Sequence, residues 1–570
     1  MHPVEEGHAS TLDELAEAYW DAYLLADPMQ GTAVGDHRYD DRLPDLTVAG
    51  RHFLRARFEG LRERVSALPP NAADPEARLT RAALLSAIDT QLALLAADSV
   101  TFTVDAMGGP QSAFMNVATF QPLRSPADGA AMLARWRAMG PWLGELALAL
   151  RRGRASGRDA VAHSIEMVLD QLDELLQLPT AQWALLAPLA ERPADFPEPE
   201  WRVFSADLER AVSEVVRPAF ARYRAFLAEE ALPLGRDEAH VGLRNLPGGS
   251  EIYDSLVRAH TTTDRSAAEL HRIGLEEVAR IDGEMAALGA HVLGTDSLEA
   301  TRAALRSDPS VHFATGDEIV GVAERSLARA QDAIPAWFGR LPQARCVVTR
   351  MLAHEERHTT IAYYREPSED GSRPGRYYIN TYAPDTRPRY EAEALAFHEA
   401  VPGHHLQVAI AQELTDLPIF RRNGMTTAYV EGWGLYSERL ANEMGLYSGD
   451  LDRIGMLSFD AWRACRLVVD TGMHAFGWSR QQAIDFMAEH SALALNNIAN
   501  EVDRYIGWPG QALAYKVGQL EILSLRRESE AALGSAFDIR RFHDAVLTHG
   551  PLPLDALREV VRDDLGLASA

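Results

Sequence analysis

Histidine and glutamate occur together twice in the sequence at spacings that could bind a metal ion. The segment His-Glu-Glu-Arg-His at 354–358 matches the short metalloprotease pattern His-Glu-x-x-His. On a helix, residues four apart lie on one face, about 6 Å apart along the axis, so both imidazoles could reach one Zn²⁺. The flanks at 347–349 and 359–361 are rich in β-branched residues, and the intervening residues are charged. We therefore interpret this segment as an exposed connection between strands.

The second combination is His-Glu-Ala-Val-Pro-Gly-His-His-Leu-Gln at 398–407. It departs from the pattern, because the residue four positions after His398 is Pro402. Helix-forming residues nevertheless precede it at 391–397 and follow it at 406–414. This setting favours an active-site helix more than that of the literal match does.

A metal shared within this segment requires a broken helix. In an unbroken helix His398 and His404 would lie about 9 Å apart along the axis and on different faces. Pro402 and Gly403 are residues that break helices, and a turn there could bring His404 back toward His398. His405 is the rival second ligand, and the alternative interpretation is a helix end with surface histidines.

A third ligand candidate lies downstream, in Tyr-Val-Glu-Gly-Trp-Gly-Leu-Tyr-Ser-Glu at 429–438. Glu431 and Glu438 are seven residues apart, so a helix would place them on one face. Glu431 is flanked by apolar residues, and a carboxylate in such surroundings needs a partner. The alternative is an ordinary amphipathic helix with salt bridges.

A third cluster, at 501–518, holds groups that could donate hydrogen bonds to a developing oxyanion or to a substrate carboxylate. These candidates are Arg504, Tyr505, Tyr515 and Lys516. Lys516 is the only lysine in the chain. The alternative interpretation is that the two tyrosines lie at the edge of the core.

The remaining sequence predicts the elements that position these residues. Helical periodicity covers most of the first 235 residues, and Pro/Gly-rich residues at 243–249 indicate a domain boundary. We predict an N-terminal helical region at 1–242, which covers the cleft, and a catalytic region at 243–570. Strand character is confined to about 345–382, so a small sheet should precede the active-site helix.

Composition excludes several classes of protein. The formal charge of −26 makes nucleic acid a poor partner, because phosphate needs a basic surface. No run of 18 apolar residues exists, so we expect no membrane-spanning helix and no membrane partner. Two cysteines and no visible secretory signal predict a cytoplasmic protein.

At three of these motifs the chain resembles the bacterial domain-of-unknown-function 885 (DUF885) family, within the zincin-like metallopeptidases. They are the segment at 398–407, Glu-Gly-Trp-Gly-Leu-Tyr-Ser-Glu at 431–438, and Arg-Tyr-Ile-Gly-Trp-Pro-Gly-Gln-Ala-Leu-Ala-Tyr-Lys-Val-Gly at 504–518. The resemblance covers most of 235–570. It implies a mainly α-helical, zincin-like fold: a large helical bundle with a small β-sheet next to the active-site helix.

Related zinc peptidases indicate how the longer spacing is arranged. Thimet-like oligopeptidases carry His-Glu-x-Gly-His, and aligning on the Gly-His pair makes His404 the second ligand. Their third ligand is a glutamate seven residues before another glutamate, which is similar to Glu431 and Glu438. A late Pro-x-Tyr-x-x-Gly segment in thermostable carboxypeptidases is similar to 509–518 and implies a role for Tyr515.

We therefore predict a zinc-dependent hydrolase, similar to a carboxypeptidase or an oligopeptidase, that cleaves peptide bonds of short peptides with a metal-activated water. His398, His404 and Glu431 would hold Zn²⁺, and Glu399 would transfer the proton of the attacking water. Tyr515, with Arg504, Tyr505 or Lys516, would stabilise the oxyanion or hold a carboxylate.

The strand at 376–382 would run beside the extended substrate in this hypothesis. The alternatives are a zinc enzyme acting on a non-peptide amide in a specialised pathway and a metal-free helical binding protein. The partner is a small peptide or amide, and the oligomeric state is left open.

Overall fold

The computed structural model describes residues 11–69, 74–351, 356, 360–367, 373–424 and 426–567. Within these ranges the chain is mainly helical and carries one small sheet, which confirms the predicted fold class. The literal metalloprotease match at 354–358 lies outside the described residues except for Glu356. Glu356 accepts hydrogen bonds from the backbone and hydroxyl of Thr381, at 2.8 and 2.6 Å.

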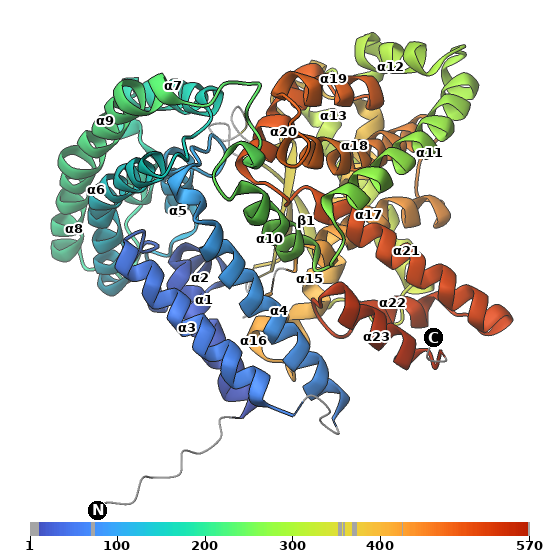
Figure 1. Cartoon of the computed structure of the whole chain (residues 1–570), viewed down its shortest axis with the longest axis horizontal. Coiled ribbons are helices and arrows are strands. Elements are labelled where there is room, and N and C mark those ends of the chain that lie inside the picture. The colour runs from blue at the N-terminus through green and yellow to red at the C-terminus, as the bar shows by residue number, and fades with distance from the viewer. Residues whose placement is uncertain are drawn as a thin grey trace, which may run out of the picture.

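The first helices form one side of the molecule (Figure 1). They are α1 (Leu12–Ala26), α2 (Pro28–Val34), α3 (Val48–Ala67), α4 (Pro75–Ala97), α5 (Pro110–Phe120), α6 (Pro126–Ala155), α7 (Ala162–Gln177), α8 (Glu198–Arg210) and α9 (Arg217–Phe226). Before the sheet come α10 (Gly249–Thr261), α11 (Ala267–Leu293), α12 (Leu298–Ser307) and α13 (Gly316–Ala333). Ser266 and Glu269 form a capping box at the start of α11, so side chains satisfy its first backbone donors.

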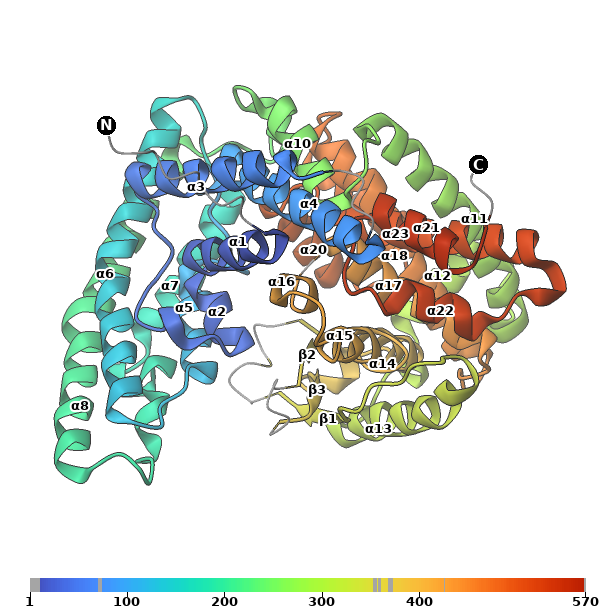
Figure 2. The same ribbon diagram turned by 90° about the horizontal axis from the view of Figure 1, so that it is seen from below.

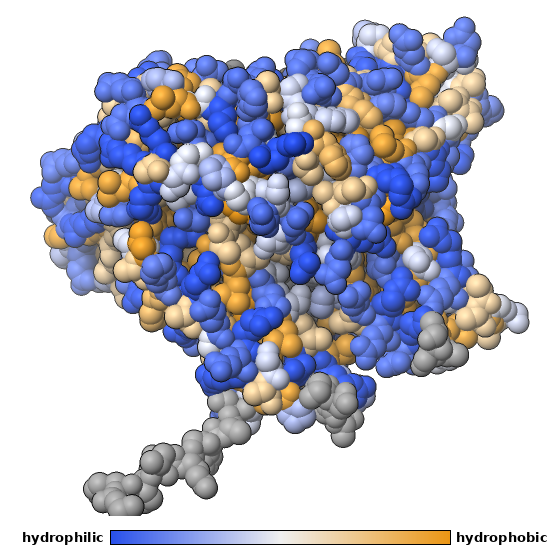
Figure 3. All heavy atoms as spheres, in the orientation of Figure 1, coloured by the Kyte–Doolittle hydropathy of each residue, from blue (hydrophilic) through white to orange (hydrophobic). Residues whose placement is uncertain are grey.

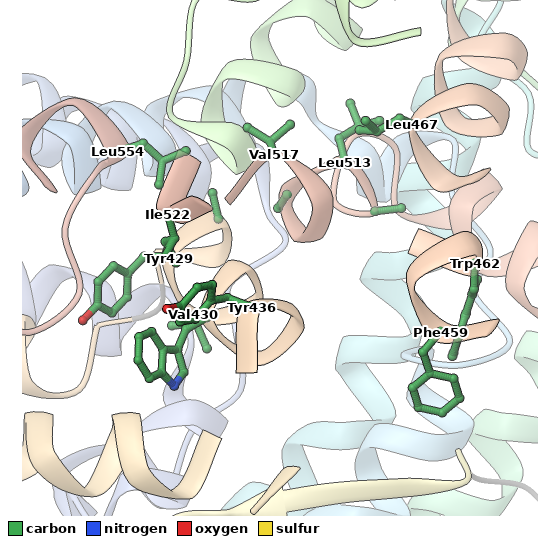
Figure 4. Close-up of a cluster of buried hydrophobic side chains, with 14 of the residues drawn as sticks. Tyr429, Val430, Tyr436, Phe459, Trp462, Leu467, Leu513, Val517, Ile522 and Leu554 are labelled. Carbon is green, nitrogen blue, oxygen red and sulfur yellow. The ribbon is translucent and has the colours of Figure 1, made fainter. Parts of the chain in front are cut away.

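The helices that follow the sheet build the other side of the molecule (Figure 1). They are α14 (Ala392–Glu399), α15 (His404–Gln412), α16 (Ile419–Arg422), α17 (Thr427–Glu443), α18 (Asp450–His474), α19 (Arg480–His490), α20 (Leu495–Gly507), α21 (Leu513–Leu533), α22 (Ile539–Leu547) and α23 (Leu554–Asp564). Side chains of α17, α18 and α21 form a buried apolar cluster that includes Tyr436, Trp462 and Val517 (Figure 4).

The sheet has three strands in the order β1-β3-β2. β1 (Cys346–Arg350) pairs in parallel with β3 (Gly375–Ile379), and β2 (Ala362–Arg365) pairs with β3 in antiparallel fashion. β3 is therefore central and uses both edges of its backbone inside the sheet. This corrects the expectation that the strand at 376–382 pairs with a substrate, because both backbone edges of β3 are occupied, whereas β2 is an edge strand and lines the large cleft described below.

The described residues form two hydrophobic cores, and the domain boundary expected at residue 243 stays a prediction. The smaller core joins α5 to α9, whereas α1, α3 and α4 pack into the larger core with the C-terminal helices. Residues 75–101, which contain α4, are long and apolar enough to cross a membrane by length and composition alone. In the structure α4 packs against α3 and α10 and buries Leu84 and Ile88 there.

On the face shown in Figure 3 the apolar side chains are scattered among hydrophilic ones. Such scattered apolar residues are normal for a protein surface. The features that position chemistry are instead inside the molecule, where α14, α15 and α17 meet.

Candidate metal centre

The segment between the two histidines breaks the helix, as the Pro-Gly pair predicts. α14 ends at Glu399 and α15 begins at His404, with a cis peptide bond between Val401 and Pro402. A Cβ on Gly403 would lie 1.9 Å from the carbonyl oxygen of His398, so only glycine fits this turn. The chain therefore reverses within a few residues and returns His404 to the side of His398.

Three side chains that can bind a metal converge at this turn. Glu431 Oε2 on α17 lies 3.7 Å from His398 Nε2 and 3.5 Å from His404 Nε2. The imidazole centroids are 4.7 Å apart with an interplanar angle of 82°, and one ligand atom from each residue lies within 4.8 Å of the others. The structure thus brings together His398, His404 and Glu431, whose roles as ligands stay a prediction.

The backbone of α17 comes very close to both imidazoles at Gly434. A Cβ at this position would lie 2.8 Å from His398 Cε1 and 3.0 Å from His404 Cε1. Glycine therefore gives the two rings the space to face Glu431, one helical turn earlier on α17. Trp433 fixes the turn from the same helix by donating its indole N–H to the Pro402 carbonyl at 2.9 Å.

Glu438 holds the other nitrogen of His398. Its Oε1 lies 2.8 Å from His398 Nδ1, and both residues are buried. Because a carboxylate oxygen accepts the hydrogen bond, Nδ1 carries a proton, and Nε2 is the nitrogen that faces the cluster and could bind a metal in place of its own proton. The glutamate pair of α17 thus faces both nitrogens of one imidazole.

His405, the rival second ligand, points away from the cluster toward the sheet. Its Nδ1 lies 3.0 Å from the Tyr364 hydroxyl and its Nε2 lies 3.1 Å from the Ala344 carbonyl oxygen. Burial lowers the pKa of His405 to about 4, so the ring is neutral at pH 7. Both nitrogens are occupied, which leaves His404 as the histidine that faces His398.

Electrostatics within the cluster favour a charged carboxylate. Burial alone would raise the pKa of Glu431, but hydrogen bonding to His398 and His404 holds it well below its ordinary value. Burial alone would lower the pKa of His398, yet its bonds to Glu431 and Glu438 raise it to about 9. The carboxylate thus stabilises positive charge between the rings, and a metal ion would take the place of that charge.

The donor set fits zinc. Two imidazole nitrogens and one carboxylate are a common ligand set of catalytic zinc sites, which leave a fourth position open. Ligand atoms 2.0–2.1 Å from a tetrahedral ion lie roughly 3.3 Å apart. The separations of 3.5 and 3.7 Å from Glu431 are close to that value. Small side-chain movements would suffice to enclose an ion.

A large cleft opens beside this cluster, with a volume of about 1370 Å³. Its walls come from α2 and α5 on one side and from β2, α14, α15, α17, α18 and α20 on the other. Figure 2 shows α2 and α5 facing the sheet across this space. His398, Glu399, His404 and Glu431 all line the cleft, and Glu399 is half-buried there.

Two of the four predicted hydrogen-bond donors lie at the cleft. Tyr515 and Arg504 line it, and Arg504 Nη2 donates to the Tyr515 hydroxyl at 3.3 Å. Tyr515 also lies under the Arg466 guanidinium, whose central carbon is 4.3 Å from the ring centroid. The tyrosine ring is therefore held in place from two directions.

The structure places the other two donors away from the cleft lining. Tyr505 is buried, donates to Glu501 at 2.6 Å and accepts from Arg466 and Trp462, so its hydroxyl is occupied away from the cleft lining. Lys516 is fully buried behind the cleft, where its Nζ lies 2.5 Å from Asp460 Oδ1 and 2.8 Å from Gln519 Oε1. The lone lysine is a buried counter-charge and does not line the cleft.

Sequence reasoning missed the arginines of α18. Arg463 and Arg466 line the cleft, although each is almost completely buried. A signal for them exists in the sequence, because Arg463 and Arg466 lie among apolar residues in the second half of α18. A charge within a helix that is buried all round needs a partner or a ligand.

A protein-family model described as "Bacterial protein of unknown function (DUF885)" matches residues 28–561. No curated protein matches the sequence. Among solved structures, a predicted lipoprotein from Colwellia psychrerythraea is similar with a TM-score of 0.90 and 26% identity, over 98% of this chain and 100% of that one.

Two further solved structures are similar to a lesser degree. A predicted lipoprotein of unknown function from Shewanella oneidensis has a TM-score of 0.73 and 18% identity over 97% of this chain and 99% of that one. Carboxypeptidase from Pyrococcus furiosus has a TM-score of 0.44 and 11% identity over 99% of this chain and 97% of that one. The family match covers nearly the whole chain, so the chain belongs to the DUF885 family of bacterial proteins.

Proposed function

We propose that this chain is a zinc-dependent hydrolase that cleaves peptide bonds of short peptides. The observation that carries the proposal is the convergence of His398, His404 and Glu431 within 4.8 Å, at the wall of a cleft of about 1370 Å³. A divalent zinc ion held by these side chains would polarise the scissile carbonyl and acidify a water molecule.

The residues of the chain supply the remaining chemistry. Glu399 follows His398 directly and lines the cleft, so it can take the proton of the attacking water and pass it to the leaving amine. The Tyr515 hydroxyl, steadied by Arg504, can donate a hydrogen bond to the oxyanion. Glu438 would hold a proton on His398 Nδ1, so that Nε2 is the nitrogen that exchanges its proton for the metal.

The cleft supports a short, extended substrate. Every residue of β2 lines it, and β2 is an edge strand whose outer backbone can pair with an added strand. α2 and α5 close the opposite side, which limits the length of chain that can enter. The predicted cytoplasmic location stays a prediction.

Metal analysis tests the proposal. Chelator-treated protein is reconstituted with zinc, its metal content is measured by mass spectrometry, and it is incubated with a mixture of short peptides and acylated amines. We expect one zinc per chain and peptide hydrolysis that returns with the metal. If H398A and E431Q each keep one tightly bound zinc, the assignment of the metal ligands is wrong. If only the acylated amines are cleaved, the substrate is a non-peptide amide and the proposed peptidase activity is wrong.

A further inference from the structure

Basic residues outnumber acidic ones in the lining of the cleft, whereas acidic residues outnumber basic ones in the chain as a whole. The whole sequence has 56 basic and 82 acidic residues. Among the described residues that line the cleft, arginines outnumber glutamates, and aspartate and lysine do not occur. The arginines are Arg350, Arg365, Arg373, Arg376, Arg422, Arg463, Arg466 and Arg504, against Glu366, Glu399, Glu431 and Glu501. Such a concentration of positive charge in an acidic protein indicates an anionic ligand.

Arg463 has buried donors that no described side chain or backbone group accepts. The residue is 4% exposed, and its guanidinium carbon lies 4.1 Å from the centroid of Trp462 and 4.5 Å from that of Phe459. Nη2 lies 3.7 Å from Glu438 Oε1, which is too long for a hydrogen bond. Nε and Nη1 have no hydrogen-bond partner within the described part of the chain.

Arg466, one helical turn later on α18, repeats this arrangement. Its guanidinium lies 4.6 Å from the Trp462 centroid and 4.3 Å from that of Tyr515. Nε donates to the Tyr505 hydroxyl and Nη2 to Glu501 Oε2, each at 2.8 Å. Nη1 is buried and finds no acceptor among the residues described. Aromatic rings thus fix both guanidinium groups, while Nε and Nη1 of Arg463 and Nη1 of Arg466 have no acceptor among the described residues.

Glu501 neutralises only part of this charge. Its Oε2 accepts from Arg466 and from the Tyr505 hydroxyl, at 2.8 and 2.6 Å, and its Oε1 lies 3.6 Å from Arg504 Nη1. Burial alone would raise the pKa of Glu501, but Arg466 and Arg504 hold it at about 2. One carboxylate therefore serves two arginines, and Arg463 has no hydrogen-bonded counter-ion among the residues that the structure describes.

We propose that Arg463 and Arg466, with Arg504 and Tyr515 beside them, form a subsite for the free terminal carboxylate of a short peptide. The inference rests on the proposed function, which it narrows to cleavage near the C-terminus of the substrate. The unpartnered N–H groups of two fixed guanidinium groups could donate to the two oxygens of a carboxylate. Arg463 lies next to Glu438, which binds His398, so the subsite is adjacent to the candidate metal ligands.

Three peptides distinguish a terminal carboxylate from other anions. Hydrolysis of Ala-Ala-Phe, its C-terminal amide and Ala-Ala-Glu amide is measured with the zinc-loaded full chain. We expect kcat/KM for the free acid to exceed that of either amide by about tenfold or more, mainly through KM. Equal rates for the free acid and the Phe amide would overturn the proposed subsite. A preference for the Glu amide would show that the arginines bind a side-chain carboxylate, which would overturn the terminal-carboxylate proposal.

Variants assign the preference to Arg463. R463M keeps the apolar stem of the side chain and removes the charge, so the ratio of acid to amide should fall to near one, and R463K should restore part of it. R453M is the matched control, because Arg453 lies at the start of the same helix, 44% exposed and paired with Asp450. It should keep the wild-type ratio. Zinc loss in R463M with an unchanged ratio would make Arg463 a positioning residue for Glu438 and overturn the proposal.

Binding separates the subsite from the hydrolase. If the wild-type chain cleaves none of the peptides, calorimetry with Ala-Ala-Phe and its amide measures affinity directly. Tighter binding of the acid, lost in R463M, would keep the subsite and refute the hydrolase. Hydrolysis without any preference for the free acid would support the hydrolase and refute the subsite. If the chain neither cleaves nor binds these peptides, both proposals are refuted.

Discussion

Glu438 Oε1 lies 2.8 Å from His398 Nδ1, and on the opposite side of the same ring Nε2 lies 3.7 Å from Glu431 Oε2. The two glutamates are seven residues apart on α17, so one helix face positions and orients a single imidazole. This relationship explains why a buried carboxylate is present in α17 at a position that does not itself face the cleft.

Removing Glu438 should weaken zinc binding while the three ligands remain. E438A leaves the proton of His398 free to move between the ring nitrogens and frees the ring to rotate. Loss of such a partner typically costs about 10–100-fold in metal affinity. A competition assay with a fluorescent chelator measures the effect. E438Q should lose less, because its amide oxygen can still accept from Nδ1; an E438A affinity equal to wild type would contradict this role.

G434A should displace the imidazoles. The new methyl group would lie 2.8 Å from His398 Cε1, closer than real Cβ contacts allow, and 3.0 Å from His404 Cε1, which is a tight contact. We expect the zinc stoichiometry of G434A to fall well below one per chain.

The matched control for this variant is G144A, in the middle of α6. Gly144 is exposed, and a Cβ there would have no heavy atom within 4 Å. Alanine should stabilise the helix by about 0.5–1 kcal/mol and leave zinc binding intact. Equal zinc binding by G434A and G144A would show that the close approach at Gly434 is unimportant.

E399Q should keep its metal and lose turnover. Glutamine has nearly the shape of glutamate but cannot accept the proton of the attacking water. We expect kcat to fall by about 10²–10⁴-fold, with one zinc per chain by mass spectrometry. Unchanged turnover in the metal-loaded variant would remove Glu399 from the mechanism.

K516M should lower stability and leave specificity unchanged. Lys516 is fully buried and pairs with Asp460 at 2.5 Å, so methionine leaves that carboxylate with Arg439 and Arg280 as its remaining cationic partners. Breaking a buried pair of this kind costs about 3 kcal/mol or more. Denaturant unfolding should show the loss, while KM per folded molecule stays at the wild-type value. A stable K516M protein with a raised KM would restore Lys516 as a substrate contact.

Protonation of His549 should make stability depend on pH. Its Nε2 lies 2.8 Å from Asp564 and its Nδ1 lies 3.5 Å from Glu76, so it links α23 and α4 to the loop between α22 and α23. Burial alone would lower the pKa of His549, but the two carboxylates raise it to about 9.

The raised pKa of His549 determines how the free energy of unfolding changes with pH. The folded protein holds the proton more tightly than the unfolded chain, whose histidine pKa is about 6.5. The contribution is therefore complete below about pH 6.5 and is lost as pH rises through 9. Relative to wild type, H549Q should lose roughly 2–3 kcal/mol of unfolding free energy at pH 6 and little at pH 10.

The matched control for this variant is H291Q. The His291 side chain is 75% exposed, so the unfolding free energy of H291Q should stay at the wild-type value at both pH values. A loss in H549Q that does not change between pH 6 and pH 10 would contradict the linkage.

Local patterns in the sequence account for much of the architecture. The helical period, the capping box at Ser266 and the strand-rich stretch before residue 390 predict the helices and the sheet, because these depend on residues close together in the chain. The Pro402-Gly403 pair likewise predicts a broken helix, since a missing donor and an unhindered backbone act locally. The ligand-type residues that surround this break were therefore identifiable from the sequence alone.

Tertiary contacts decided which of these residues face the cleft. His404 and His405 are neighbours in sequence, and only the packing of α15 between α17 and the sheet turns one toward His398 and the other toward Tyr364. Lys516 lies next to Tyr515, yet α11 and α18 enclose it in carboxylates while Tyr515 faces the cleft. Arg463 becomes a candidate carboxylate ligand because distant helices exclude water around it. Burial and partner choice are properties of contacts between segments far apart in the chain, and a local sequence pattern does not carry them.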